Sequence, residues 1–154
     1  IASLSIVKLP LVQWIIPLIL LVCLVVKSER SIDNGRHSRE AVAKVQELRD
    51  ENARVVMYPK YRILGYSYYF NRERFEKYDA EYGFYNVLEG FKEENFYGIN
   101  QYSEARIDTT VNKVIFMMTD GGPKGQLISD FQADFKLKKK CFFPDIIEVF
   151  EFER

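Results

Sequence analysis

The feature that most constrains this chain is an apolar stretch near its start. Residues 9–26, LPLVQWIIPLILLVCLVV, contain no charged side chain, and Lys8 and Lys27 flank them. As an α-helix the stretch would extend over roughly 27 Å, close to the ~30 Å thickness of a bilayer's hydrocarbon core. The sequence therefore predicts a transmembrane helix within residues 1–26. We expect membrane lipid to be one partner of the chain.

Two other interpretations fit the stretch less well. A secretory signal has a shorter apolar core and a small-residue cleavage site, whereas KSERSID follows Val26. A buried core helix would carry a polar face, and residues 9–26 offer only Gln13. Gln13, Trp14 and Pro17 are candidate contacts with neighbouring helices, because a polar side chain and a proline inside a span are often accommodated by partners. A tolerated irregularity explains them equally well.

Charge and cysteine content exclude several classes of protein. Lys and Arg total 22, as do Asp and Glu, so the formal net charge is zero. A nucleic-acid-binding protein would normally show a basic excess. Cys23 lies in the apolar stretch and Cys141 far along the chain, which leaves no disulfide framework. Two cysteines and one histidine cannot supply a structural zinc site, so we predict no metal.

Patterning after the apolar stretch predicts an α+β fold: one N-terminal transmembrane helix, then a small domain with a helix packed on a mostly antiparallel sheet. Residues 27–37 are polar and are expected to form a juxtamembrane linker, and 38–154 the domain. Within the domain we expect a helix at 38–52, strands at 61–70, 105–118, 126–136 and 146–153, turns at 120–125 and 138–140, and a loop-rich excursion at 71–104. Apolar and polar residues alternate along 126–136, so we expect this strand to form a hairpin with 105–118. The helix should pack on the sheet through an apolar stripe at positions 41, 45 and 48.

Catalytic patterns are missing from the sequence. His37 is the only histidine and falls in the predicted linker, so a histidine base is excluded from the domain. Cys141 follows three lysines but is most simply a half-buried, unreactive thiol. The GGPKG segment at 121–125 lacks the Ser or Thr that follows the lysine of a phosphate-binding loop. We therefore expect no enzyme activity, no cofactor and no small-molecule substrate.

One family resemblance emerges from the order of these segments. The helix SREAVAKVQELRDEN, the Ile63-Leu64-Gly65 strand, ARIDTTV, the GGPKGQ turn, LISDFQADF and the closing IIEVFEFE resemble a mitochondrial inner-membrane family. That family unites the twenty-one-kilodalton presequence-translocase subunit with the first cytochrome oxidase assembly factor. The resemblance implies a non-enzymatic, single-pass inner-membrane protein whose C-terminal domain lies in the intermembrane space. Basic residues after the apolar stretch would instead favour the matrix side.

The expected function is therefore that of a non-catalytic accessory or assembly subunit of a respiratory-chain complex, acting by protein–protein contacts. Aromatic residues suit such contacts, and the candidates in the domain are Tyr66, Tyr68, Tyr69, Phe96 and Tyr97. An alternative is a presequence-translocase subunit or receptor that binds basic targeting peptides through Asp130 and Asp134 on a sheet face.

Overall fold

The computed structural model describes residues 10–119, 124–144 and 146–154. Side chains are described from Ile15 onward, with gaps at 26–36, 79–82, 84, 120–124 and 145. The chain divides into two compact units, residues 1–35 and residues 36–154, and each is described by itself. The helices and strands, in chain order, are α1 (Pro10–Leu48), β1 (Arg54–Tyr58), η1 (Lys60–Arg62), α2 (Ile63–Phe70), α3 (Arg72–Tyr82), α4 (Phe84–Lys92), β2 (Phe96–Gly98), η2 (Tyr102–Ala105), β3 (Lys113–Met118), α5 (Lys124–Asp134), β4 (Lys136–Phe143) and β5 (Ile147–Glu153).

The predicted transmembrane helix at 1–26 is corrected by the structure. Among the residues it describes, no helix is both long enough and apolar enough to cross a bilayer. The apolar residues do not form a helix of their own, because α1 continues beyond Val26 through the charged residues that begin at Lys27.

The same helix overturns two further predictions about the start of the domain. The linker expected at 27–37 lies inside α1, and Ser38 does not begin a helix. The predicted apolar stripe on this segment is nevertheless present, because Ala41 and Val45 are buried and Leu48 is partly buried against the core.

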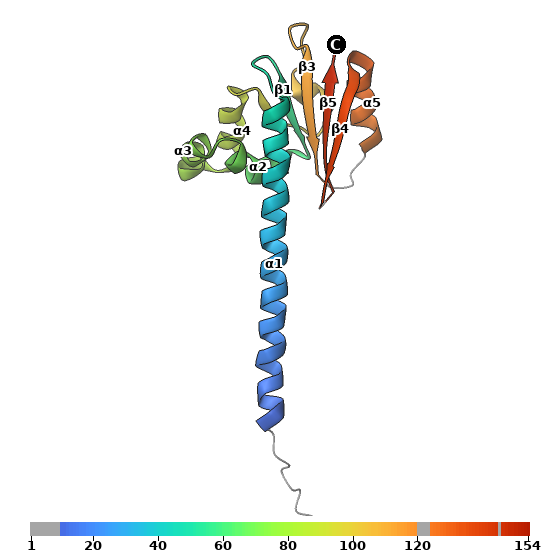
Figure 1. Ribbon diagram of the computed structural model, residues 1–154. Coiled ribbons are helices and arrows are strands. Elements are labelled where there is room, and N and C mark those ends of the chain that lie inside the picture. The colour runs from blue at the N-terminus through green and yellow to red at the C-terminus, as the bar shows by residue number, and fades with distance from the viewer. Residues whose placement is uncertain (1–9, 120–123, 145) are drawn as a thin grey trace, which may run out of the picture. The chain divides into compact units, whose positions relative to one another are not determined.

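A five-stranded mixed sheet forms the centre of the second unit, with the order β2-β1-β3-β5-β4 (Figure 1). β1 is parallel to both of its neighbours, β2 and β3. β5 is antiparallel to both β3 and β4. The prediction of a mostly antiparallel sheet was therefore wrong, because the long helical connection between β1 and β2 returns the chain to the same end of the sheet before β2 begins.

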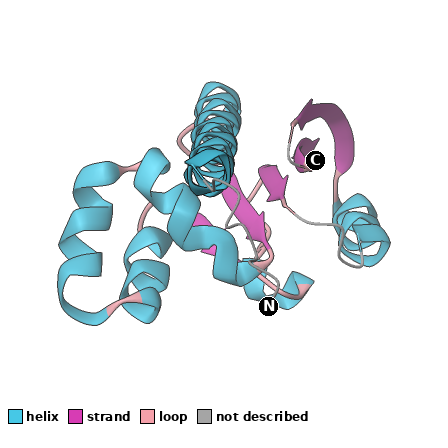
Figure 2. Cartoon of the chain, turned by 90° about the horizontal axis from the view of Figure 1, so that it is seen from below, coloured by secondary structure: helices cyan, strands magenta, loops and turns pink. Residues whose placement is uncertain are grey.

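Helices cover both faces of this sheet (Figure 2). On one face, side chains of α1, α2 and α4 pack against alternate residues of the strands, among them Val55, Ile115 and Val149. On the other face, α5 packs against the intervening residues, including Phe116 and Phe150. The strands therefore bury both of their faces, which explains the nearly continuous apolar run of β3.

Two segments predicted as strands are helices. Residues 61–70 are rich in aromatic side chains, but they form η1 and α2, with Ile63, Tyr66, Ser67 and Phe70 buried at helical spacing. Residues 126–136 lie largely within α5, so the predicted hairpin between 105–118 and 126–136 does not form. β3 pairs with β1 and β5 instead.

The remaining differences concern segments that looked too polar or irregular to be regular structure. The excursion predicted at 71–104 contains α3, α4 and β2. The turn predicted at 138–140 lies inside β4, an edge strand whose lysines point into solvent. The closing strand predicted at 146–153 is confirmed as β5. Most of the turn predicted at 120–125 lies outside the described residues.

Candidate interaction surfaces

The first candidate surface is the apolar part of α1 from Ile15 to Val25. Large aliphatic side chains on all sides of this helix are 44–64% exposed. A helix that is apolar all round is normally buried, because leaving such side chains in water is unfavourable. At about 1.5–3 kcal/mol per buried side chain, covering this surface would release on the order of 10 kcal/mol. Pro17, one of the predicted contact residues, lies inside this exposed stretch.

A second candidate surface lies in the second unit, at the end of the sheet where the parallel strands have their carboxyl ends. Because β1, β2 and β3 are parallel, their carboxyl ends lie together. β5 is antiparallel to β3, and Met118 at the end of β3 pairs with Glu148 at the start of β5. The turn between β4 and β5 therefore lies at the same edge, which is the lower end of the sheet in Figure 1.

Four strongly exposed apolar or aromatic side chains lie along this end of the sheet. Tyr61 follows β1 and is 59% exposed, and Phe142 and Ile146 flank the β4–β5 turn at 67% and 58%. Tyr85, 76% exposed, is near the start of α4. Since α4 ends just before β2 begins, its first turn lies toward the carboxyl ends of the strands. We call these four residues the apolar edge.

Polar contacts hold the loops at this edge in place. Glu104 Oε2 accepts hydrogen bonds from the backbone N–H groups of Asn100 (2.5 Å) and Gln101 (3.3 Å), and its Oε1 accepts one from Lys60 Nζ (3.1 Å). Burial acts to raise the pKa of Glu104, but these donors together lower it below its usual value. A pocket of about 300 Å³ lies beside them, lined by Lys60, Glu104 and Tyr85 among others.

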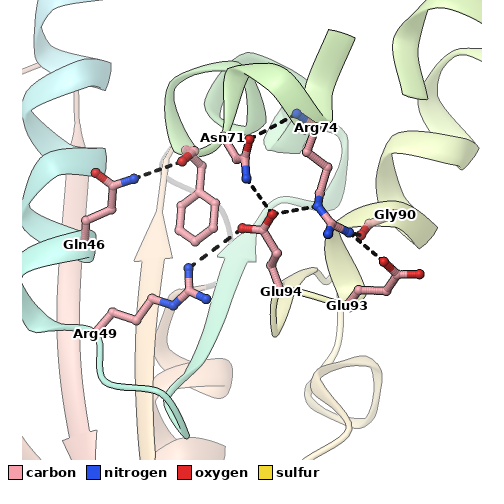
Figure 3. Close-up of polar contacts among 8 residues, drawn as sticks. Gln46, Arg49, Asn71, Arg74, Gly90, Glu93 and Glu94 are labelled. Carbon is pink, nitrogen blue, oxygen red and sulfur yellow. Dashed lines mark hydrogen bonds and ion pairs between the residues drawn. The ribbon is translucent and has the colours of Figure 1, made fainter. Parts of the chain in front are cut away.

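A separate polar cluster lies around Glu94 and joins α1, α3 and α4 (Figure 3). Glu94 Oε1 is 2.7 Å from Arg74 Nε and accepts a hydrogen bond from Asn71 Nδ2 at 2.7 Å. Arg49 Nη1 is 3.9 Å from Glu94 Oε2. Arg74 also donates to the carbonyl of Gly90 at 2.9 Å. Every partner of the central carboxylate belongs to the same unit, so the cluster fastens helices to one another and is structural.

The predicted contact residues lie mostly in the core. Tyr66, Phe96 and Tyr97 are at most 9% exposed, and they supply packing area within the domain. Tyr69 is partly buried against the core, and Tyr68 is at the surface. These five residues therefore do not form one surface. The side chains of Gln13 and Trp14 lie outside the described residues.

The acidic pair proposed for a peptide receptor lies on a helix and not on a sheet face. Asp130 and Asp134 are one turn apart on α5. Asp134 accepts a hydrogen bond from Tyr102 Oη at 2.5 Å, and Asp130 accepts one from Gln126 at 2.7 Å. Both carboxylates thus have partners within the domain. Across the residues that the structure describes, no group of three His, Cys, Asp or Glu side chains is placed to hold a metal ion.

Reasoning from the sequence did not identify any residue of the apolar edge. Tyr61 was assigned to a strand, Tyr85 to the loop-rich excursion and Ile146 to the last strand, and Phe142 was assigned to no element. A local signal was present in the sequence FFPDI at 142–146, where aromatic and aliphatic residues stand beside a proline. Proline favours turns, and a turn exposes the side chains next to it.

Comparison with known proteins finds no matching family model, no similar curated protein and no similar solved structure.

Proposed function

We propose that this chain is a non-catalytic accessory or assembly subunit of a respiratory-chain complex of the mitochondrial inner membrane, acting through protein–protein contacts. The observation that carries the proposal is the exposed apolar surface of α1 between Ile15 and Val25. Such a surface requires an apolar partner, and helices of other subunits provide one.

The second unit supports a binding role in a different way. Its ion pairs around Glu94 and its hydrogen bonds around Glu104 link helices and loops of the same domain. They stabilise a rigid body, which is what a docking subunit needs. The choice of a mitochondrial respiratory complex rests on the family resemblance of the sequence segments.

Native purification tests the proposal directly. The tagged chain is isolated from mitochondrial membranes in mild detergent, and co-purifying proteins are identified by mass spectrometry. Leu21→Asp places a charge on the exposed apolar surface, and Ala43→Asp places the same charge on an exposed position of the same helix in the second unit. We expect respiratory-complex subunits with the wild type and with Ala43→Asp, and their loss with Leu21→Asp.

Three outcomes contradict the proposal. A wild-type protein recovered alone would show that it has no stable partner. Equal recovery of partners with Leu21→Asp would show that the apolar surface is not the contact. Recovery of translocase subunits instead would assign the chain to protein import.

A further inference from the structure

We propose that the apolar edge binds the surface of a lipid bilayer, with Phe142 and Ile146 entering the acyl region and Tyr61 and Tyr85 lying at the headgroups. This inference concerns the second unit and does not depend on the proposed function.

The distribution of exposed side chains is the first argument. In the described part of the second unit, the four most exposed large apolar or aromatic side chains are those of the apolar edge. Leu137, the next most exposed, is 40% exposed and lies at the opposite end of β4, where it pairs with Phe152. Apolar side chains scattered singly over a surface are normal, but their concentration at one edge marks a binding surface.

The path of the chain is the second argument, because a further exposed apolar segment precedes the apolar edge in the sequence. α1 ends at Leu48, and β1 begins at Arg54. Lys113, at the start of β3, lies 3.8 Å from Asp50, so the end of α1 is at the amino ends of the parallel strands. Residues 36–48 therefore run back toward their carboxyl ends, and the chain enters the second unit at the apolar edge. The exposed apolar residues 15–25 precede this entry point in the sequence.

The chemistry of the edge is the third argument, and it selects lipid as the occupant. Tyrosine combines an apolar ring with a polar hydroxyl and is enriched at membrane–water interfaces. Lys140 Nζ lies 4.3 Å from the centre of the Phe142 ring, and a lysine stem can follow an inserted ring while its ammonium stays among the headgroups. Carboxylates described near this edge are engaged with lysines, among them Glu104 with Lys60 at 3.1 Å and Glu148 with Lys140 at 3.7 Å.

Single tryptophan reporters in the full chain test the proposal. Trp14, the only native tryptophan, is replaced by phenylalanine, and Phe142→Trp or Leu137→Trp is then introduced. Both positions are exposed on β4, so the tryptophan at position 137 serves as a matched control at the opposite end of the same strand. Each protein is mixed with phosphatidylcholine vesicles, with and without phosphatidylglycerol. Circular dichroism verifies the fold, and lipids brominated in the acyl chains report contact with the bilayer.

We expect the tryptophan at position 142 to emit at shorter wavelength and to be quenched by brominated lipid, most strongly in vesicles with phosphatidylglycerol. The tryptophan at position 137 should keep the emission of a water-exposed residue in all vesicles. Equal behaviour of the two reporters, or failure of the chain to float with vesicles, would overturn the proposal. So would a reporter at position 142 that stays water-exposed on vesicles but is shielded in the natively purified complex, because the edge would then bind protein.

Discussion

Replacing Phe131 and Ala133 in parallel tests whether α5 is a helix or the strand that its alternating pattern indicated. In the helix, Phe131 is buried and Ala133, two residues later, is exposed. In a strand the two side chains would point to the same face and would share the same burial. A lysine at position 133 would therefore be tolerated at the surface of the helix but would be forced into the core by a strand.

The magnitudes follow from the packing of each side chain. Phe131 is 0% exposed, and its ring centre lies 5.0 Å from those of Phe116 and Tyr102 and 5.5 Å from that of Phe152. Phe131→Ala should therefore lower the free energy of unfolding by about 3–5 kcal/mol. Ala133→Lys adds an exposed cation near the helix C-terminus, where the helix dipole favours it, so the change should stay within about 0.5 kcal/mol.

Hydrogen exchange measured by mass spectrometry gives the free energy of unfolding from the full chain in mild detergent. The amides of β3 and β5 lie at the centre of the sheet and are expected to exchange only when the second unit unfolds. Their exchange should accelerate by two to four powers of ten in Phe131→Ala, because each 1.36 kcal/mol corresponds to a factor of ten. In Ala133→Lys it should remain near the wild-type rate.

A destabilisation of several kcal/mol by Ala133→Lys would refute the helical assignment. It would mean that position 133 is buried together with Phe131, as a strand requires, and that a charged side chain had been forced into the core. A small effect of Phe131→Ala would refute the packing of α5 on the sheet.

Three further predictions concern the polar contacts of the second unit. Glu94→Gln removes the central charge of its cluster and should cost about 1–3 kcal/mol in the same exchange assay, whereas Glu93→Gln, whose side chain is 68% exposed, should change it by less than about 1 kcal/mol. The pKa of Glu104 is lowered in the folded state, so the ionised carboxylate stabilises the fold above the usual pKa of 4.5, and this stabilisation is lost as pH falls through the lower folded pKa. Acid unfolding followed by circular dichroism should therefore depend less steeply on pH in Glu104→Gln. An unchanged profile would contradict the reasoning. Gly90→Ala would place a methyl group against the Tyr78 ring and should cost about 1–3 kcal/mol in urea unfolding, unless that ring moves freely aside.

The misassignment of α5 has a simple geometric origin. Leu127, Phe131 and Phe135 are buried and four residues apart. A spacing of four residues keeps side chains on one face both in a strand of period two and in a helix of period 3.6. Ala133 is compatible with either environment, so the alternation favoured a strand. Ile128 is partly buried against the core and Ser129 is exposed, as a helix requires, and these two residues were the signal that the strand interpretation overlooked.

The misassignment of α2 has a different cause, because here the pattern was informative. Ile63, Tyr66, Ser67 and Phe70 are buried and follow the spacing i, i+3, i+4, i+7 of a helix face. The high strand propensity of aromatic residues outweighed that signal in the sequence interpretation. Propensity is a weak guide when tertiary packing decides the structure, as it does here, where the helix covers one face of the sheet.

The last strand was predicted correctly because most of its residues are apolar and buried. β5 contributes Ile147, Val149, Phe150 and Phe152 to the two cores, and its apolar character was recognised. β4 was interpreted as a turn because its lysines are exposed on an edge strand. Charged side chains on an edge oppose pairing with other chains, so the composition of β4 reflects its position in the sheet and not an absence of strand structure.

The apolar edge could not have been predicted from any one segment, because it exists only through the topology of the sheet. Tyr61, Tyr85, Phe142 and Ile146 belong to four different parts of the chain. They lie at one end of the sheet because β1, β2 and β3 are parallel while β5 returns antiparallel to β3, which brings the β4–β5 turn to the carboxyl ends of the others. The sheet expected from the sequence had no strand at 54–58, so it could not have placed Tyr61 at the carboxyl ends of these strands. The mixed topology thus creates the surface, and its exposed apolar and tyrosine side chains make contact with a bilayer the consequence to test.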